Sequence, residues 1–241
     1  MLKQAGSGKS TLMKFAADHR HTRQLLSQWA EPSKLYTASF YFWNQGFPAQ
    51  RTQIGLFRSL LYQILRSSPT LAVGLPQGRL EHEVWERHDL QNAIEHIAKK
   101  STDAKFCFFI DGLDEYEGEE EDVVEMLNFL TTCPNIKLCV SSRIRPFFED
   151  HIKDLEHRNI LVISNYTKPG MAQHVSEQLL QSPDFRQLRA PQKAIADLVE
   201  EMSQKADGVW LWVFLVTRKL LRAVARKEDI KKLQELIDVI P

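Results

Sequence analysis

The sequence predicts an α/β fold in which a parallel sheet is flanked by helices and followed by an all-helical region. Two observations predict it. Short apolar runs alternate with segments whose apolar residues recur at helical spacing, which is typical of a parallel sheet covered on both faces. From Met171 onward the spacing is helical throughout. We therefore expect an α/β domain at residues 1–165 and a helical domain at residues 166–241, divided near the composition shift at 166–170.

The individual elements follow from hydrophobic periodicity and from turn residues. The strand candidates are continuous apolar, aromatic or β-branched runs, at residues 35–43, 106–110, 136–140 and 159–163. The helix candidates carry apolar residues on one face, at residues 11–20, 54–65, 90–97, 171–180, 192–206, 209–225 and 228–238. Residues 67–83 contain two prolines and two glycines and predict a loop.

Composition and charge argue against several functions. Among the 241 residues, 31 Lys and Arg balance 31 Asp and Glu, which makes nucleic-acid binding unlikely and gives no support to membrane-surface binding. The most apolar stretch, Val209–Val216, is far shorter than the roughly 20 residues that span a membrane. The 3 cysteines lack CxxC spacing, and Cys107 and Cys139 lie in apolar runs. We expect unpaired thiols in a reducing compartment, and hence a cytoplasmic location.

A phosphate-binding loop is predicted at the segment Ala5-Gly6-Ser7-Gly8-Lys9-Ser10-Thr11, which matches the end of the pattern GxxxxGK[ST]. Glycines let the backbone fold tightly so that its N–H groups point at an anion, and the following helix presents its positive N-terminal end. We expect Lys9 to reach the β- and γ-phosphates of a nucleotide and Ser10 to ligate Mg²⁺. The alternative interpretation is a glycine-rich turn that begins a helix.

Two features depart from the phosphate-loop pattern. Lys3 stands where the pattern has its first glycine. Only Met1 and Leu2 precede it, although a strand should lead into such a loop. We therefore expect the first strand of the sheet to be missing from this chain.

An acidic strand end supplies the second half of the predicted site. The apolar run Phe106–Ile110 is followed directly by Asp111, which places a carboxylate at the sheet edge where ligands of α/β proteins gather. We expect Asp111 to hold Mg²⁺ through its water shell, and Glu115 to polarise an attacking water as general base. Asp114 is expected to assist the metal or to orient that base. A helix N-cap with acidic residues is the alternative, but it would explain one carboxylate rather than three.

The run Ile136–Val140 ends on Ser141-Ser142-Arg143. An arginine at a strand end can contact the γ-phosphate and report its presence, so Arg143 is a candidate catalytic sensor. The alternative is a surface arginine in a salt bridge.

Several stretches, in this order, carry a resemblance to a known family. They are AGSGKSTLMKF, ASFYFWNQG, LFRSLLYQIL, FFIDGLDEYEG, IKLCVSSRIRPFFE and KADGVWLWVFLVTRKLL. Together they resemble the NACHT class of signal-transduction P-loop NTPases (the STAND group), and in particular fungal NOD-like receptors and nephrocystin-type N-terminal domains.

The resemblance implies a sheet in the order 5-1-4-3-2 and a helical domain that closes over the nucleotide. It also implies that ADP holds an inactive state, that ATP permits self-association, and that slow hydrolysis acts as a timer in innate-immune signalling. Relatives carry an N-terminal effector and C-terminal repeats, so we expect this chain to be a core that lacks both.

The leading hypothesis is thus an ATP/ADP-binding switch with slow Mg²⁺-dependent hydrolysis. A degenerate interaction scaffold, which keeps the fold but not the nucleotide, is the alternative. A nucleotide or small-molecule kinase ranks last, because such an enzyme would not need the acidic pair after Asp111 and no arginine-rich lid is visible.

Overall fold

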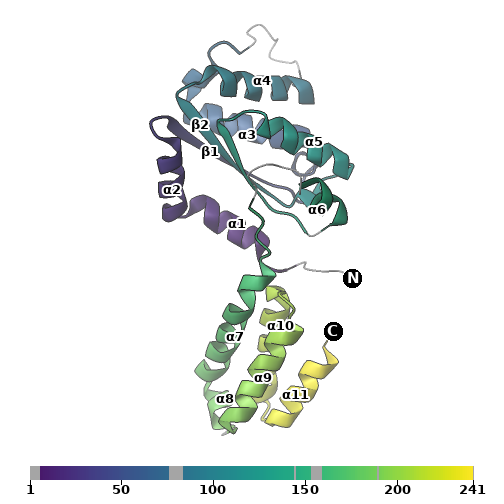
Figure 1. Ribbon diagram of the computed structural model, residues 1–241. Coiled ribbons are helices and arrows are strands. Elements are labelled where there is room, and N and C mark those ends of the chain that lie inside the picture. Colours follow the sequence, from purple (N-terminus) through teal and green to yellow (C-terminus); the bar gives the residue numbers. More distant parts are fainter. Residues whose placement is uncertain (1–5, 76–83, 144, 153–158, 189, 241) are drawn as a thin grey trace. The chain divides into compact units, whose positions relative to one another are not determined.

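Figure 1 shows the computed structural model of the protein, which describes residues 6–75, 84–143, 145–152, 159–188 and 190–240. The chain forms two compact units. The sheet unit spans Ser10–His157, and the helical unit combines Met1–Lys9 with Arg158–Pro241. These units describe packing alone, so the predicted domain division at residue 165 stays a prediction.

The sheet unit alternates helices and strands, as its sequence predicts. Its elements are α1 (Lys9–Asp18), α2 (Arg20–Ala30), β1 (Lys34–Tyr41), α3 (Gln53–Ser67), α4 (Arg87–Lys100), β2 (Ala104–Asp111), α5 (Glu120–Thr131), β3 (Ile136–Val140) and α6 (Pro146–Ile152). The loops hold three short 3₁₀-helices, at Pro48–Gln50, Pro69–Ala72 and Leu113–Glu115. Helix α1 begins at Lys9, within the predicted phosphate loop, and continues into the sheet unit.

The three strands form a parallel sheet in the order β1-β2-β3. This order confirms the α/β class. It also agrees with the order 5-1-4-3-2 that the resemblance implies, in which strands 2, 3 and 4 are neighbours. In register, Tyr41 lies opposite Asp111, and Ile110 lies opposite Val140. The carboxyl ends of the strands therefore meet at one edge of the sheet.

The sheet is buried on both faces, which explains the continuous apolar sequence of β2. Phe106, Phe108 and Ile110 pack into the larger core with α3, α4 and α5. Cys107 and Phe109 point to the opposite face, where the smaller core includes residues of α1 and α2. Figure 1 shows α1 and α2 on one side of the strands and α3 to α5 on the other.

At the outer edge of β1, a side chain hydrogen-bonds the backbone groups of Ser39. The amide of Gln63 in α3 accepts a hydrogen bond from the Ser39 N–H at 3.0 Å and donates one to the Ser39 carbonyl at 2.8 Å. It thereby occupies both backbone groups through which Ser39 would pair with a further strand.

The helical unit contains α7 (Ser164–Gln181), α8 (Pro183–Gln187), α9 (Gln192–Lys205), α10 (Trp210–Ala225) and α11 (Ile230–Val239). Its core forms because each longer helix buries one stripe of apolar residues. In α10 the stripe includes Val213, Val216 and Leu220, each at most 2% exposed. The apolar run 209–216 is therefore a half-buried helix segment, and none of the helices described is long and apolar enough to cross a membrane.

Some element predictions were wrong. Residues 159–163 form no strand: they are irregular up to a turn at Ile163, and Ile160 and Leu161 are 63% and 58% exposed. A five-residue apolar run carries too little periodicity to separate a strand from a connecting segment. The helix expected at residues 171–180 begins earlier, at Ser164. The helix candidates also omit α2, α5, α6 and α8.

Candidate functional site

The predicted phosphate loop has the backbone geometry of an anion-binding nest. Gly6 and Gly8 have φ of +79° and +86°, whereas Ser7 between them is not among the residues with positive φ, and Lys9 begins α1. Successive residues of alternating handedness turn their N–H groups toward one centre, which favours an anion. The nest also leads into the N-terminal end of a helix. Ala5 and Lys3, the other residues considered for this loop, lie outside the described residues.

Within the loop, the Lys9 ammonium donates a hydrogen bond to the Ser7 hydroxyl at 3.1 Å. Ser7 is 2% exposed, and Lys9 is half-buried. The Lys9 side chain thus folds back onto the predicted phosphate loop.

The next residues of α1 border an open hollow of about 800 Å³. It is lined by Ser10, Thr11, Lys14, Phe15, Asp18, His19, Arg20 and Tyr41. Tyr41 ends β1 and lies opposite Asp111 in register, so Ser10 and Asp111 approach the same tyrosine from two elements. The pKa of Tyr41 is raised, first by burial and then by the negative charges of Asp18 and Asp111.

Asp111 is the last residue of β2 and is 3% exposed. Its carboxylate accepts a hydrogen bond from the Ser141 hydroxyl. Backbone bonds hold the same junction: the Ser141 N–H donates to the Ile110 carbonyl at 2.9 Å, and the Leu113 N–H donates to the Ser141 carbonyl at 3.0 Å. Gly112 makes the turn possible, with φ of +74°.

Asp114 lies in the short 3₁₀-helix that follows and is paired with Arg143. Its Oδ1 accepts the Arg143 N–H at 2.8 Å, and its Oδ2 lies 3.0 Å from Arg143 Nε. Its backbone carbonyl accepts a further bond from the Arg145 guanidinium at 3.1 Å. The salt bridge considered for Arg143 is therefore present, and its sensor role stays a prediction.

Glu115 follows on the same 3₁₀-helix and is half-buried. Its Oε2 accepts a hydrogen bond from the Asn44 N–H at 3.1 Å, in the loop after β1. The structure thus gathers Asp111, Asp114, Glu115 and Arg143 at one edge of the sheet. Residues 6–9 belong to the other compact unit, whereas Ser10 and Thr11 belong to the sheet unit.

The sequence of this chain matches a known protein family. Residues 3–143, more than half of the chain, match the family described as "Nephrocystin 3, N-terminal". The chain belongs to the nephrocystin 3 N-terminal family. No curated protein matches the sequence. A chain in "Structure of Drosophila ORC bound to DNA" is similar, with 17% identity, a TM-score of 0.42, and coverage of 98% of this chain and 53% of that chain. This chain thus spans about half the length of that solved chain.

The nephrocystin match contains both halves of the predicted site. It includes the loop at 6–11 and the acidic strand end at 111–115, and it stops at Arg143. Such a core is consistent with a nucleotide-binding fold of the P-loop type. Helices α7 to α11 lie outside the matched range.

Sequence reasoning missed three residues of this nephrocystin-type core. Ser141 donates a hydrogen bond to Asp111, the Asn44 N–H donates one to Glu115, and Tyr41 lines the same hollow as Ser10 and lies opposite Asp111 in register. Ser141 could have been predicted, because it follows a strand that is parallel to β2 and ends at the same sheet edge. Asn44 could not, because its contact with Glu115 is made by its backbone N–H, which does not depend on residue type.

Proposed function

We propose that this chain is the nucleotide-binding core of a signalling switch of the NACHT class, which binds ATP or ADP with Mg²⁺ and hydrolyses ATP slowly. The observation that carries the proposal is the alternating geometry of residues 6–9 at the start of α1. Lys9 would contact the β- and γ-phosphates, with the N–H groups of Gly6, Ser7 and Gly8 around them. Thr11, in the same first turn, would contact a phosphate through its backbone N–H.

The residues proposed for Mg²⁺ fit that ion in their chemistry. Ser10 and Asp111 offer a hydroxyl and a carboxylate, and Mg²⁺ prefers oxygen ligands and retains several waters. The hydrogen bond from Ser141 fixes the Asp111 carboxylate. When bound, the ion would neutralise phosphate charge.

Hydrolysis would require a group that activates water and a group that senses the γ-phosphate. Glu115 is proposed as the base, because its carboxylate lies at the same sheet edge as Asp111. Arg143 is proposed as the sensor: it now pairs with Asp114 through Nε, so a γ-phosphate would compete with that carboxylate for the guanidinium.

The remaining features of the proposal rest on the resemblance to NACHT proteins. They are a cytoplasmic location, self-association in the active state, and effector and repeat regions outside this chain. The equal numbers of acidic and basic residues favour a protein or nucleotide partner over a nucleic acid.

Calorimetric titration with Mg-ADP and Mg-ATP tests the proposal. We expect micromolar binding by the wild-type chain and none by Lys9→Ala, because the variant loses the cation that faces the phosphates. Lys193→Ala is the matched control, since it removes an exposed lysine from α9. Equal binding by the wild type and Lys9→Ala would exclude the proposed site.

An interaction scaffold without nucleotide is the second candidate, and one observation favours it. Asp114 and Glu115 are both proposed to take part in hydrolysis, but each already accepts a hydrogen bond from a backbone N–H group. These hydrogen bonds give both residues a structural role that needs no nucleotide. A ligand that binds only the folded state must raise its thermal stability. A melting temperature that Mg-ATP leaves unchanged would therefore support the scaffold.

A further inference from the structure

The first turn of α10 lies directly against the phosphate loop. The Leu211 N–H donates a hydrogen bond to the Gly6 carbonyl at 3.0 Å. A β-carbon at Gly6 would lie only 2.7 Å from Leu211 Cβ, and one at Gly8 would lie 3.4 Å from Trp210 Cδ1. Two consecutive residues of α10 thus contact the two glycines that give the nest its shape.

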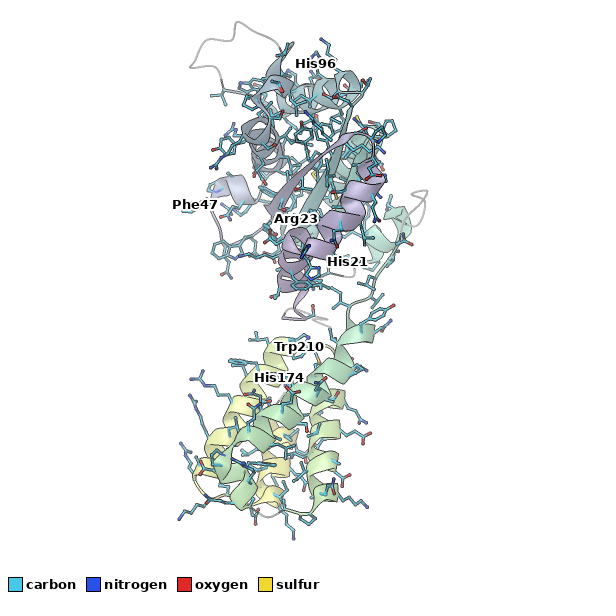
Figure 2. The ribbon with its side chains drawn as sticks, turned by 90° about the vertical axis from the view of Figure 1, so that its left-hand side faces the viewer. His21, Arg23, Phe47, His96, His174 and Trp210 are labelled. Atoms are coloured by element: carbon cyan, nitrogen blue, oxygen red, sulfur yellow. The ribbon has the colours of Figure 1, made fainter. Side chains whose placement is uncertain are left out.

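The position of Trp210 is fixed from several sides. Asp207 and Gly208, with φ of +42° and +86°, reverse the chain between α9 and α10 and set where α10 begins. The indole ring lies edge to face with His174 of α7, with ring centroids 5.7 Å apart. Figure 2 labels both side chains. A β-carbon at Gly170 would lie 3.6 Å from the same indole. Trp210 therefore contacts both α7 and the loop.

Such support matters because the loop is costly to order. Glycine loses more backbone freedom on ordering than any other residue, and fixing one residue costs about 1–2 kcal/mol. A nest that is held in shape before its ligand arrives avoids this cost at the moment of binding. The contacts from α10 reach the Gly6 carbonyl and the sides of Gly6 and Gly8 where a β-carbon would project, and none of these contacts is made to an N–H group of the nest, which is the group that would face an anion.

We infer that the first turn of α10 pre-organises the phosphate loop, with Trp210 as the positioning residue, so that nucleoside-phosphate affinity depends on the helical unit. This inference rests on the proposed function for its ligand. Its supporting residues, 207–211, lie outside the matched range 3–143. Binding at the loop and the packing of α10 are then linked, and each affects the other by the same factor.

Calorimetry of the full chain with Mg-ADP tests the inference. We expect Trp210→Ala to weaken binding about tenfold and Trp210→Phe to restore most of it, because a phenyl ring still fills the space beside Gly8. Trp212→Ala is the matched control: this half-buried tryptophan two residues further along α10 packs on the helical core. Tight binding by Trp210→Ala, equal to that of the wild type, would overturn the inference and leave the proposed function intact.

A spectroscopic signature separates positioning from a general loss of stability. The 5 tryptophans can be replaced by fluorotryptophan, and the Trp210 resonance is assigned by its absence in Trp210→Phe. We expect Mg-ADP to shift that resonance and to leave Trp29 unchanged, which lies in the sheet unit beside Lys105 and Lys137. Binding without any shift at Trp210 would also overturn the inference.

If the wild-type chain binds no nucleotide, the proposed function fails, and the structural half of the inference is decided separately. Hydrogen exchange of the nucleotide-free protein measures the order of residues 6–9 directly. We expect faster exchange there in Trp210→Ala than in the wild type or Trp212→Ala. Unchanged exchange would show that α10 does not support the loop.

Discussion

Arg143 binds Asp114 through its backbone and its side chain at once. The Arg143 N–H donates to Oδ1 at 2.8 Å, and Nε lies 3.0 Å from Oδ2. The Asp114 side chain is 4% exposed and that of Arg143 is 38% exposed, so the carboxylate is the buried member of the pair. The pair joins the segment after β2 to the segment after β3, and both segments hold predicted site residues.

Asp114→Ala should destabilise the sheet unit by about 2 kcal/mol, because it leaves the Arg143 N–H without its acceptor and removes the ion pair. Asp114→Asn keeps an oxygen for that N–H and loses only the charge, so we expect about half the effect. Urea denaturation of both variants measures the difference. Equal losses would show that the backbone hydrogen bond contributes little.

Glu115→Gln should bind nucleotide like the wild type and lose turnover by at least about a hundredfold, the lower range for removal of a general base. The glutamine carbonyl can still accept the Asn44 N–H that Glu115 binds now, so the turn should persist. Single-turnover phosphate release checks the rate, and thermal unfolding checks the fold. Unchanged turnover would remove Glu115 from the base role.

Two glycine-to-alanine variants should differ in their effect on stability. Gly112→Ala should cost about 1–2 kcal/mol, because φ is +74° and the new methyl would lie 3.0 Å from the Phe42 carbonyl oxygen. Gly170→Ala should be neutral or stabilising, because the residue lies in α7 and its methyl would make an ordinary contact with Trp210 at 3.6 Å. Denaturation midpoints decide the signs. A stable Gly112→Ala protein would mean that the turn can take another conformation.

Stability should fall at alkaline pH through Cys107. Burial raises the pKa of this thiol from 9.0 to about 12. Above pH 9 the unfolded chain releases a proton that the folded chain keeps, so the stabilisation is complete below pH 9 and is lost as pH rises toward 12. Cys107→Ala should show a shallower decline over this range in denaturation experiments. An identical pH profile would contradict the assignment.

The sequence predicts most of the sheet unit because its strands are buried on both faces. In β2 every residue of the run FCFFI is apolar, so both faces of the strand must be covered by other elements, and the acidic residues that follow the run mark the end of the strand. The same reasoning failed at 159–163, where Ile160 and Leu161 are exposed although the local sequence is equally apolar. Whether a short apolar run finds a partner strand depends on tertiary context, which one segment does not encode.

The candidate site divides in the same way. Residue types and their spacing predict Lys9 and Asp111 as site residues, because phosphate and metal chemistry favour those types at those spacings. Spacing does not reveal that Asp114 is occupied by Arg143, since the pairing depends on the order of β2 and β3 in the sheet. The contact of Leu211 with Gly6 joins residues about 200 positions apart and leaves no local pattern.

The side-chain amide of Gln63 affects whether a further strand can be added to this sheet beside β1. By holding the N–H and carbonyl of Ser39, it imitates a neighbouring backbone and terminates the sheet beyond β1. A strand gained by insertion, or offered by another molecule, would have to displace that amide before it could pair there. The Gln63 side chain therefore protects the β1 edge at Ser39 against pairing with a further strand.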